Sequence, residues 1–395
     1  MIYRVVPPNR MNQVEDLWDY CFEKKDDPFF QYYFQEYVGK NNWVIGGFEE
    51  KDNWEYLKNM VHVNPYSVRI RGKEQLVPYL VGVATAPEAR GQHLFEPLLK
   101  TTFDVLRSQE VCFVTLMPIF AGIYKPYEFA YYHFRHEYKL NLEALVKLGR
   151  KTFDVNLERT DFDAQRLAPL YQAFTENMSG VPMRTEFQWN KLIAVNKAEK
   201  VQCVYASEDD KPTGYMFYKL TDGTFNAIEI VALTNETKFA FLNFAAQHKS
   251  DAEEFVWLAP EWDKTYLNFN DQALTGGIAP FMMARCIDAR RALADIKPAN
   301  KSIIGEVNIL LTDDLIDRNN HMLKLIADSG QLGVSSTMDN EDITMGMAAF
   351  TQMYMGAFTA SELAEAGLIK VKDATKLALL DQLFPKLRTY NNEYF

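Results

Sequence analysis

The chain has 395 residues, 48% hydrophobic and 24% charged, with a formal net charge of −11. This length suits two or three domains with separate cores, and the composition is ordinary for a globular protein in water. The acidic balance argues against non-specific nucleic-acid binding and favours a cationic substrate. No apolar run reaches the roughly 18 residues of a membrane span, and the N-terminus reads as a strand rather than a signal peptide, so we expect a cytoplasmic protein.

Cysteine and histidine spacing gives no sign of a disulfide or metal site. Cys21, Cys112, Cys203 and Cys286 lie far apart, without the CxxC spacing of a zinc site or the pattern of a disulfide framework. His133 and His136 are close in sequence, but in a strand this spacing directs them to opposite faces. We therefore expect no metal.

Residues 1 to about 147 read as one α/β unit. Chain order predicts a strand at 3–6, a helix with Val14, Leu17, Trp18 and Cys21 on one stripe, an aromatic cluster at 29–34, strands at 43–48 and 56–63, a turn at 72–75, a central strand at 76–85 and a strand at 111–117. The aromatic cluster favours core packing, although a few rings at a pocket mouth could bind a flat or cationic substrate.

The stretch from Val81 to Lys100 predicts a strand, a tight turn and a helix. It is β-branched at first, breaks at Ala86-Pro87 and resumes as a helical pattern from Leu94. The start of a helix presents unpaired backbone N–H groups and the positive end of its dipole, which together can hold a diphosphate. Arg90 and Gly91 stand where a phosphate would lie.

The sequence VATAPEARGQ resembles the acetyl-CoA pyrophosphate loop of the GNAT N-acetyltransferases, with Val83, Pro87 and Arg90 in register. His93 and Phe95 stand where that family often has glycine. The resemblance implies a GNAT fold and acetyl-CoA as acyl donor. The residues that it places at the cofactor are Val83, Ala84, Thr85, Arg90, Gly91, Gln92, His93, Leu94, Phe95 and Glu96.

The segment 119–129 resembles the I-Y-x-x-F-G-[YF] signature near the end of the GNAT fold, with Glu128 in the usual Gly position. The resemblance makes Tyr124 the general acid. A phenol with a pKa near 10 can protonate a departing thiolate. Many GNAT enzymes carry a Glu base on the central strand, but 76–85 contains no acidic residue, so the base must come from elsewhere.

Two further units follow. The second, about 154–263, is predicted to contain a helix with Leu167, Leu170 and Phe174, strands at 201–206, 214–220 and 225–233, a hairpin turn at 222–223 and a helix at 238–248. Its segment 231–237 has no Gly or Arg to hold a diphosphate. We therefore interpret the second unit as a degenerate GNAT-like domain that shapes the substrate cleft.

The third unit follows a linker at 268–280. Strands are predicted at 283–287, 303–311, 322–328 and 332–337, and helices at 342–355, 360–367 and 373–383, with Thr359 and Ser361 as N-caps. Four methionines, Met345, Met347, Met353 and Met355, could fill a core or line a lipid pocket.

The whole chain resembles the Eis (enhanced intracellular survival) family: an acetyltransferase domain, a degenerate copy, a sterol-carrier-like domain and an aromatic C-terminus. The predicted α/β (α+β) domains are therefore 1–150, 151–280 and 281–395. In that family the C-terminal carboxylate acts as general base in the first domain, which implies Phe395 here. Relatives acetylate amines of aminoglycosides and lysines and form hexamers, so a homo-oligomer is implied.

The expected function is transfer of acetyl from acetyl-CoA to a primary amine by direct attack. The sequence does not distinguish an aminoglycoside-like acceptor from a polyamine or a lysine. One alternative is a ligand-binding or scaffold protein that keeps the Eis architecture without catalysis. A Fem-type peptidyl transferase with tandem GNAT domains would need a basic coiled arm for tRNA, which the sequence lacks.

Overall fold

The computed structural model describes residues 1–148, 154–269 and 276–394. The chain divides into two compact units. Unit 1 combines residues 1–132 and 282–387 with the last residues from Glu393 onward, and it contains the first and third domains. Unit 2 consists of 133–281 and 388–392 and contains the second domain.

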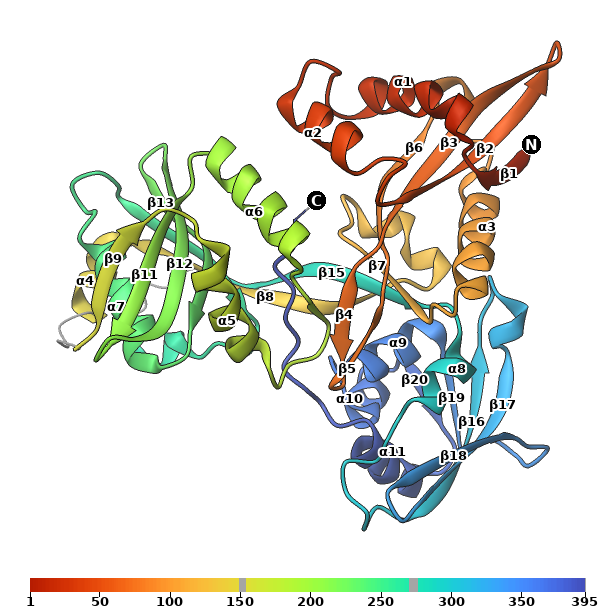
Figure 1. Cartoon of the computed structure of the whole chain (residues 1–395). Coiled ribbons are helices and arrows are strands. Elements are labelled where there is room, and N and C mark those ends of the chain that lie inside the picture. Colours follow the sequence, from red (N-terminus) through yellow and green to blue (C-terminus); the bar gives the residue numbers. More distant parts are fainter. Residues whose placement is uncertain (149–153, 270–275, 395) are drawn as a thin grey trace. The chain divides into compact units, whose positions relative to one another are not determined.

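The first domain is a twisted sheet between helices (Figure 1). Its strand order is β1 (Ile2–Val5), β2 (Trp43–Lys51), β3 (Trp54–Asn64), β6 (Tyr79–Thr85), β7 (Phe113–Leu116) and the end of β15 (Ile278–Cys286). All pairs are antiparallel except β6 with β7. Helices α1 (Met11–Cys21) and α2 (Pro28–Glu36) cover one face, and α3 (Phe95–Ser108) covers the other. In the predicted stripe of α1, Val14, Leu17 and Trp18 are buried and Cys21 is partly exposed.

The central strand begins later than predicted. Residues 73–75 do not form a turn: β4 (Ser67–Ile70) and β5 (Lys73–Leu76) form a hairpin closed at Gly72, whose φ is +78°. Pro78 precedes β6 and has no N–H to extend a ladder, so the strand begins at Tyr79 rather than Leu76.

The second domain is a six-stranded sheet with a core on each face. The order is the end of β8 (Ala130–Asn141), then β14 (Glu254–Pro260), β13 (Thr224–Ala232), β12 (Lys211–Thr221), β11 (Gln202–Glu208) and β9 (Asn156–Thr160). Alternating side chains of β11 and β12 enter the two cores, as the period of a strand requires. Helices α4 (Leu142–Leu148) and α7 (Asn235–Ala246) border one core, and α5 (Ala164–Thr175) and α6 (Glu186–Ala198) the other. The bridge strand β10 (Val181–Pro182) follows α5.

The third domain packs four helices on a five-stranded sheet. The order is β18 (Gln331–Ser336), β17 (His321–Asp328), β16 (Gly305–Thr312), β19 (Ile343–Gly346) and β20 (Ile369–Val371). The helices are α8 (Ala289–Ala294), α9 (Met347–Met355), α10 (Ala360–Glu365) and α11 (Leu377–Leu383). The helix predicted from 342 is wrong at its start: residues 343–346 are strand β19, which pairs in parallel with β16, and this tertiary pairing overrides the local pattern.

The predicted N-caps of the third domain and the predicted linker before it differ in outcome. Thr359 is the N-cap of α10 and forms a capping box with Glu362, whereas Ser361 lies inside the first turn and donates to Asp381. The predicted linker 268–280 lies partly outside the described residues, and its end belongs to β15.

The four methionines singled out in the third domain fill its core. Met345, Met347, Met353 and Met355 are each at most 1% exposed, which confirms the core interpretation over the lipid pocket for these side chains. All four cysteines are free thiols.

Candidate active site

The central feature of the first domain is a pair of parallel strands that separate. β6 and β7 are paired at one register position, Tyr79 with Thr115. On its other edge β6 has an irregularity opposite Met60 and His62. Gly82 there has a φ of +56°, and a Cβ on it would meet the Trp18 ring at 2.3 Å, so this close approach requires glycine.

The predicted strand, turn and helix are confirmed around this point. β6 ends at Thr85, a 3₁₀ turn spans Pro87–Ala89, and α3 begins at Phe95 with Leu94 as N-cap. No described side chain caps this helix start, so its first N–H groups remain available to a ligand. The prediction that an anion could bind here is consistent with this geometry.

The loop before α3 contains left-handed backbone conformations, which glycine usually occupies. Gly91 has a φ of +74°, and His93, at a position where the resembled family often has glycine, adopts +54°. Arg90 is exposed, and its Nε donates to the Thr85 carbonyl at 3.2 Å. Gln92 is tied to the loop through a bond from Nε2 to the Glu88 carbonyl.

The start of α3 is fixed to the sheet and to residues 119–129, which we call the tyrosine loop. Asn59 Nδ2 donates to the Leu94 carbonyl at 2.8 Å. The Phe95 ring lies 5.8 Å from the Tyr124 ring, centroid to centroid, in an edge-to-face arrangement. Glu96 faces solvent and pairs with Lys100. The predicted cofactor residues thus follow one another from the end of β6, through the loop, to the start of α3. Their role in binding stays a prediction.

Tyr124 is half-buried beside this loop. It lies between two 3₁₀ turns, and its ring also packs edge-to-face on Phe129. Burial raises its pKa, so the phenol keeps its proton at neutral pH. Within the part of the chain that the structure describes, its hydroxyl has no hydrogen-bond partner. It therefore has a proton to donate.

Residues of α9 and of β15 hold the tyrosine loop in place, which sequence reasoning missed. Glu128 adopts a left-handed φ of +61° in the usual Gly position and accepts a hydrogen bond from Ala348 N, in the first turn of α9, at 2.9 Å. Arg285 of β15 donates to the Tyr127 carbonyl and forms a fully buried ion pair with Asp313 at 2.7 Å. These partners are 150 or more residues away, so no local pattern could have indicated them.

A buried polar network beside β6 was also missed. The Tyr33 hydroxyl lies 3.0 Å from His62 Nδ1 and donates to Asn64 Oδ1 at 3.2 Å, and Asn42 Nδ2 donates to the same hydroxyl. Burial lowers the pKa of His62 to about 3, so its ring is neutral. Within the predicted aromatic cluster, Phe30 and Tyr33 are core residues. A lone histidine on a strand gave no sequence signal.

The proposed base, Phe395, lies outside the described residues. The preceding segment, residues 388–392, is anchored in the second domain: Thr389 bridges Ser179, and the Tyr390 hydroxyl donates to Glu229 at 2.9 Å. We call these five residues the C-terminal strap. Glu393 belongs to unit 1 and is 6% exposed. Burial raises the pKa of Tyr37 to about 12 and the Glu393 carboxylate acts in the same direction, which places Glu393 near α2 of the first domain.

The equivalent junction of the second domain, between β13 and α7, carries a carboxylate. Thr234 caps the helix by accepting from Thr237 N, and both threonine hydroxyls donate to Glu208 at about 3 Å. An acidic side chain at a helix start opposes binding of a diphosphate. The interpretation of this domain as degenerate agrees with this contact.

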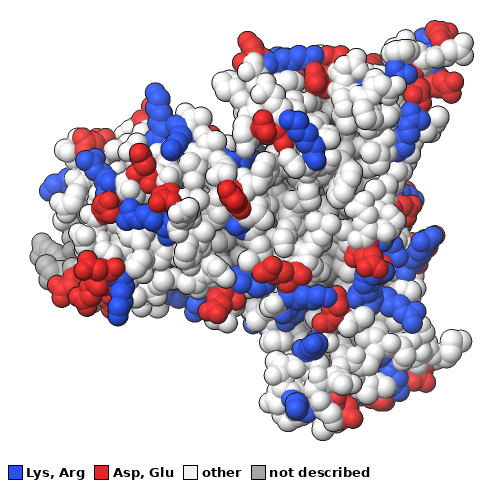
Figure 2. Space-filling model, viewed as in Figure 1, with Lys and Arg blue, Asp and Glu red and all other residues white. Residues whose placement is uncertain are grey.

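No helix in the described ranges is long and apolar enough to cross a membrane. The described residues contain no group of three or more metal-binding side chains. On the face drawn in Figure 2, acidic and basic side chains are interspersed rather than gathered by sign.

Comparisons with known proteins identify the domains. Residues 3–132 and 180–286 each match a family described as an acetyltransferase (GNAT) domain, and residues 287–392 match the sterol carrier protein domain. No curated protein matches the chain.

Several solved structures share the whole fold. A conserved protein of unknown function from Enterococcus faecalis V583, titled a probable N-acyltransferase, has 21% identity and a TM-score of 0.87, with 100% of both chains covered. A GCN5-related N-acetyltransferase from Anabaena variabilis has 18% identity and a TM-score of 0.84, again with 100% of both chains covered. Eis1 from Mycobacterium abscessus has 16% identity and a TM-score of 0.79 over 100% of both chains. The chain therefore consists of two GNAT domains and a sterol carrier protein domain, the domain content of a GNAT-type acetyltransferase.

Proposed function

We propose that the protein is an acetyl-CoA-dependent N-acetyltransferase of the Eis type whose active site lies in the first domain. The observation that carries the proposal is the separation of β6 from β7 beside an uncapped helix start and a protonated tyrosine. Separated strands leave backbone groups without partners in the sheet, and those groups can pair with an extended ligand. Acetyl-CoA would supply the thioester.

The protein's own groups would act on charge and protons. The first-turn N–H groups of α3 and the Arg90 guanidinium would hold the diphosphate. A backbone N–H of residues 83–85 would donate to the oxyanion that forms at the attacked carbonyl. Tyr124, whose phenol keeps its proton, would protonate the departing thiolate.

The C-terminal carboxylate of Phe395 would act as base. An alkyl amine is almost wholly protonated at neutral pH, and deprotonating it costs on the order of 4 kcal/mol. β6 carries no acidic residue that could take the proton. The buried position of Glu393 beside Tyr37 supports a C-terminus that enters the first domain, where burial would raise the basicity of a carboxylate.

The acceptor is proposed to be a primary amine of an aminoglycoside, a polyamine or a protein lysine. The protein would act as a homo-oligomer, by resemblance a hexamer. Three exposed apolar side chains of the tyrosine loop, Ile119, Phe120 and Ile123, suit contact between copies.

The decisive test moves the terminal carboxylate. One alanine added after Phe395 displaces it by a residue, and we expect acetylation, measured as CoA release over a panel of amines, to fall about 100-fold or more. Phe395→Tyr keeps the carboxylate in place and serves as the matched control. Full activity of the extended chain would remove the carboxylate from the mechanism.

A non-catalytic scaffold is the alternative. Calorimetry with acetyl-CoA separates the two, because an enzyme shows saturable binding and a scaffold shows none. Arg90→Gln should weaken that binding, whereas Arg166→Gln, in the second domain, should not.

A further inference from the structure

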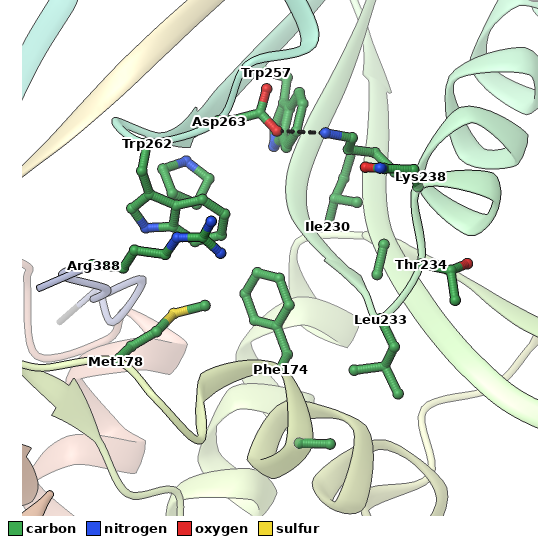
Figure 3. A pocket seen from close by; sticks show the side chains of 14 residues that line it. Phe174, Met178, Ile230, Leu233, Thr234, Lys238, Trp257, Trp262, Asp263 and Arg388 are labelled. Carbon is green, nitrogen blue, oxygen red and sulfur yellow. Dashed lines mark hydrogen bonds and ion pairs between the residues drawn. The ribbon is translucent and has the colours of Figure 1, made fainter.

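A cavity of about 310 Å³ lies within the second domain, at the junction of β13 and α7 (Figure 3). β13 and β14 pair in parallel from Thr224 with Glu254 to Ala227 with Trp257, and no pairing continues beyond that point. The cavity is lined by the ends of both strands, by α5 and α7, and by Arg388 of the C-terminal strap. Its volume is at the lower end of the range for small-molecule sites, about 300–1,000 Å³.

The walls are aromatic. Trp257, Trp262 and Phe174 line the cavity from three different segments, and Met178 adds a flexible apolar side chain (Figure 3). Trp262 is held in place because its Nε1 donates to the Thr389 carbonyl at 3.1 Å. Flat apolar surfaces on several sides suit a planar ring system.

The charges that line the cavity sum to one excess positive charge. Lys238 pairs with Asp263 at 2.8 Å, and Asp263 also accepts from the Tyr138 hydroxyl and Thr265 N, so this pair is satisfied. The Arg388 guanidinium lies 4.7 Å from the centroid of the Trp262 ring, and in the described residues no carboxylate is within ion-pair distance of it. All five of its N–H donors can therefore meet an anion.

We propose that this cavity binds a small planar monoanion, such as an aromatic carboxylate. The ring would lie among Trp257, Trp262 and Phe174, and the carboxylate would pair with Arg388 in the bidentate geometry that guanidinium favours. This site is separate from the proposed acetyl-CoA site, and it requires no catalysis in the second domain.

Calorimetric titration of the full-length protein with 2-naphthoate tests the proposal. We expect saturable one-to-one binding to the wild type, and at least tenfold weaker binding of the uncharged 2-naphthamide. Arg388→Gln should weaken 2-naphthoate binding about tenfold, and this exposed side chain can be changed with little risk to folding. The matched control Arg166→Gln removes a partly exposed arginine that lies over another ring, Tyr205, outside the cavity, and it should bind like the wild type.

A filling variant locates the ligand. Ala173→Phe, on α5 at the cavity rim, should abolish binding, whereas Gln172→Phe on the same helix should not. Absence of saturable binding to the wild type, equal affinity for naphthoate and naphthamide, or unchanged binding in Ala173→Phe would each overturn the proposal. If Ala173→Phe does not fold, judged by circular dichroism, the Arg388→Gln and Arg166→Gln pair decides.

Discussion

Both GNAT domains contain two parallel strands that separate, but different groups lie beside the separation. In the first domain β6 leaves β7 after Tyr79, next to a loop with Arg90 and Gly91 and a helix start that no side chain caps. In the second domain β13 leaves β14 after Ala227. The C-terminal strap contacts β13 there, because Asn392 Nδ2 donates to the Ile228 carbonyl at 3.2 Å.

The difference shows how one backbone geometry serves two purposes. Backbone groups released where strands separate need partners, because unpaired buried groups are costly. The second domain satisfies one with Asn392 and anchors the strap there, while Glu208 occupies the helix start. The first domain has no such internal partner for its helix start among the described side chains, which leaves it suited to a ligand.

The largest effect concerns the tyrosines that follow the two separating strand pairs. Tyr124→Phe removes the proposed acid, and we expect the turnover number for acetylation to fall about 100-fold or more, with little change in acetyl-CoA affinity. Tyr266→Phe, in the 3₁₀ turn after β14, is the matched control and should keep wild-type activity. Steady-state CoA release measures both. Equal activities of the two variants would break the contrast between the domains.

The second effect is on the anchor of the strap. Arg184 and Glu229 form an ion pair at 2.8 Å with both side chains at most 2% exposed, and Tyr390 and Asn392 both donate to Glu229. Arg184→Met leaves a buried carboxylate without its cation and should lower the free energy of unfolding by about 3–5 kcal/mol.

Urea denaturation followed by circular dichroism measures this loss. The control pair is Arg166 with Glu158, which is far more exposed, and Arg166→Met should cost no more than about 1 kcal/mol. Similar losses in the two variants would show that the buried pair stabilises the protein no more than the exposed pair does.

The smallest effect is a dependence of stability on pH. His62 in the first domain and His133 in the second are both buried, and burial lowers each pKa to about 3. These folded-state values lie below the unfolded value of about 6.5, so the unfolded chain binds more protons and stability falls as pH falls from 6.5 toward 3. The slope should approach about 1.4 kcal/mol per pH unit for each histidine.

Denaturation at pH 7, 6 and 5 checks this slope above the range where carboxylates titrate. His62→Gln and His133→Gln should each flatten it by a similar amount, because each unit contributes one such histidine. A slope unchanged by both substitutions would contradict neutral burial of these rings.

The local sequence pattern was enough to predict the secondary-structure elements near the proposed site. The β-branched run, the Pro87 break and the apolar spacing after Leu94 predicted the strand, turn and helix, because backbone preferences and periodicity act over a few residues. The same reasoning failed where a distant partner decided the structure. Residues 343–346 became a strand through pairing with β16, and the hairpin β4–β5 was missed.

Short-range motifs in the sequence were enough to predict the domain content and the candidate cofactor loop. Only the tertiary structure revealed that Ala348 of α9 and Arg285 of β15 hold the tyrosine loop, through Glu128 and the Tyr127 carbonyl, and that the strap is anchored at Glu229. It also decided that the separation in the second domain adjoins a cavity lined by Arg388, which has no carboxylate partner among the described residues. These contacts join residues more than 100 positions apart, and their energies depend on burial and geometry, which residue order alone does not specify.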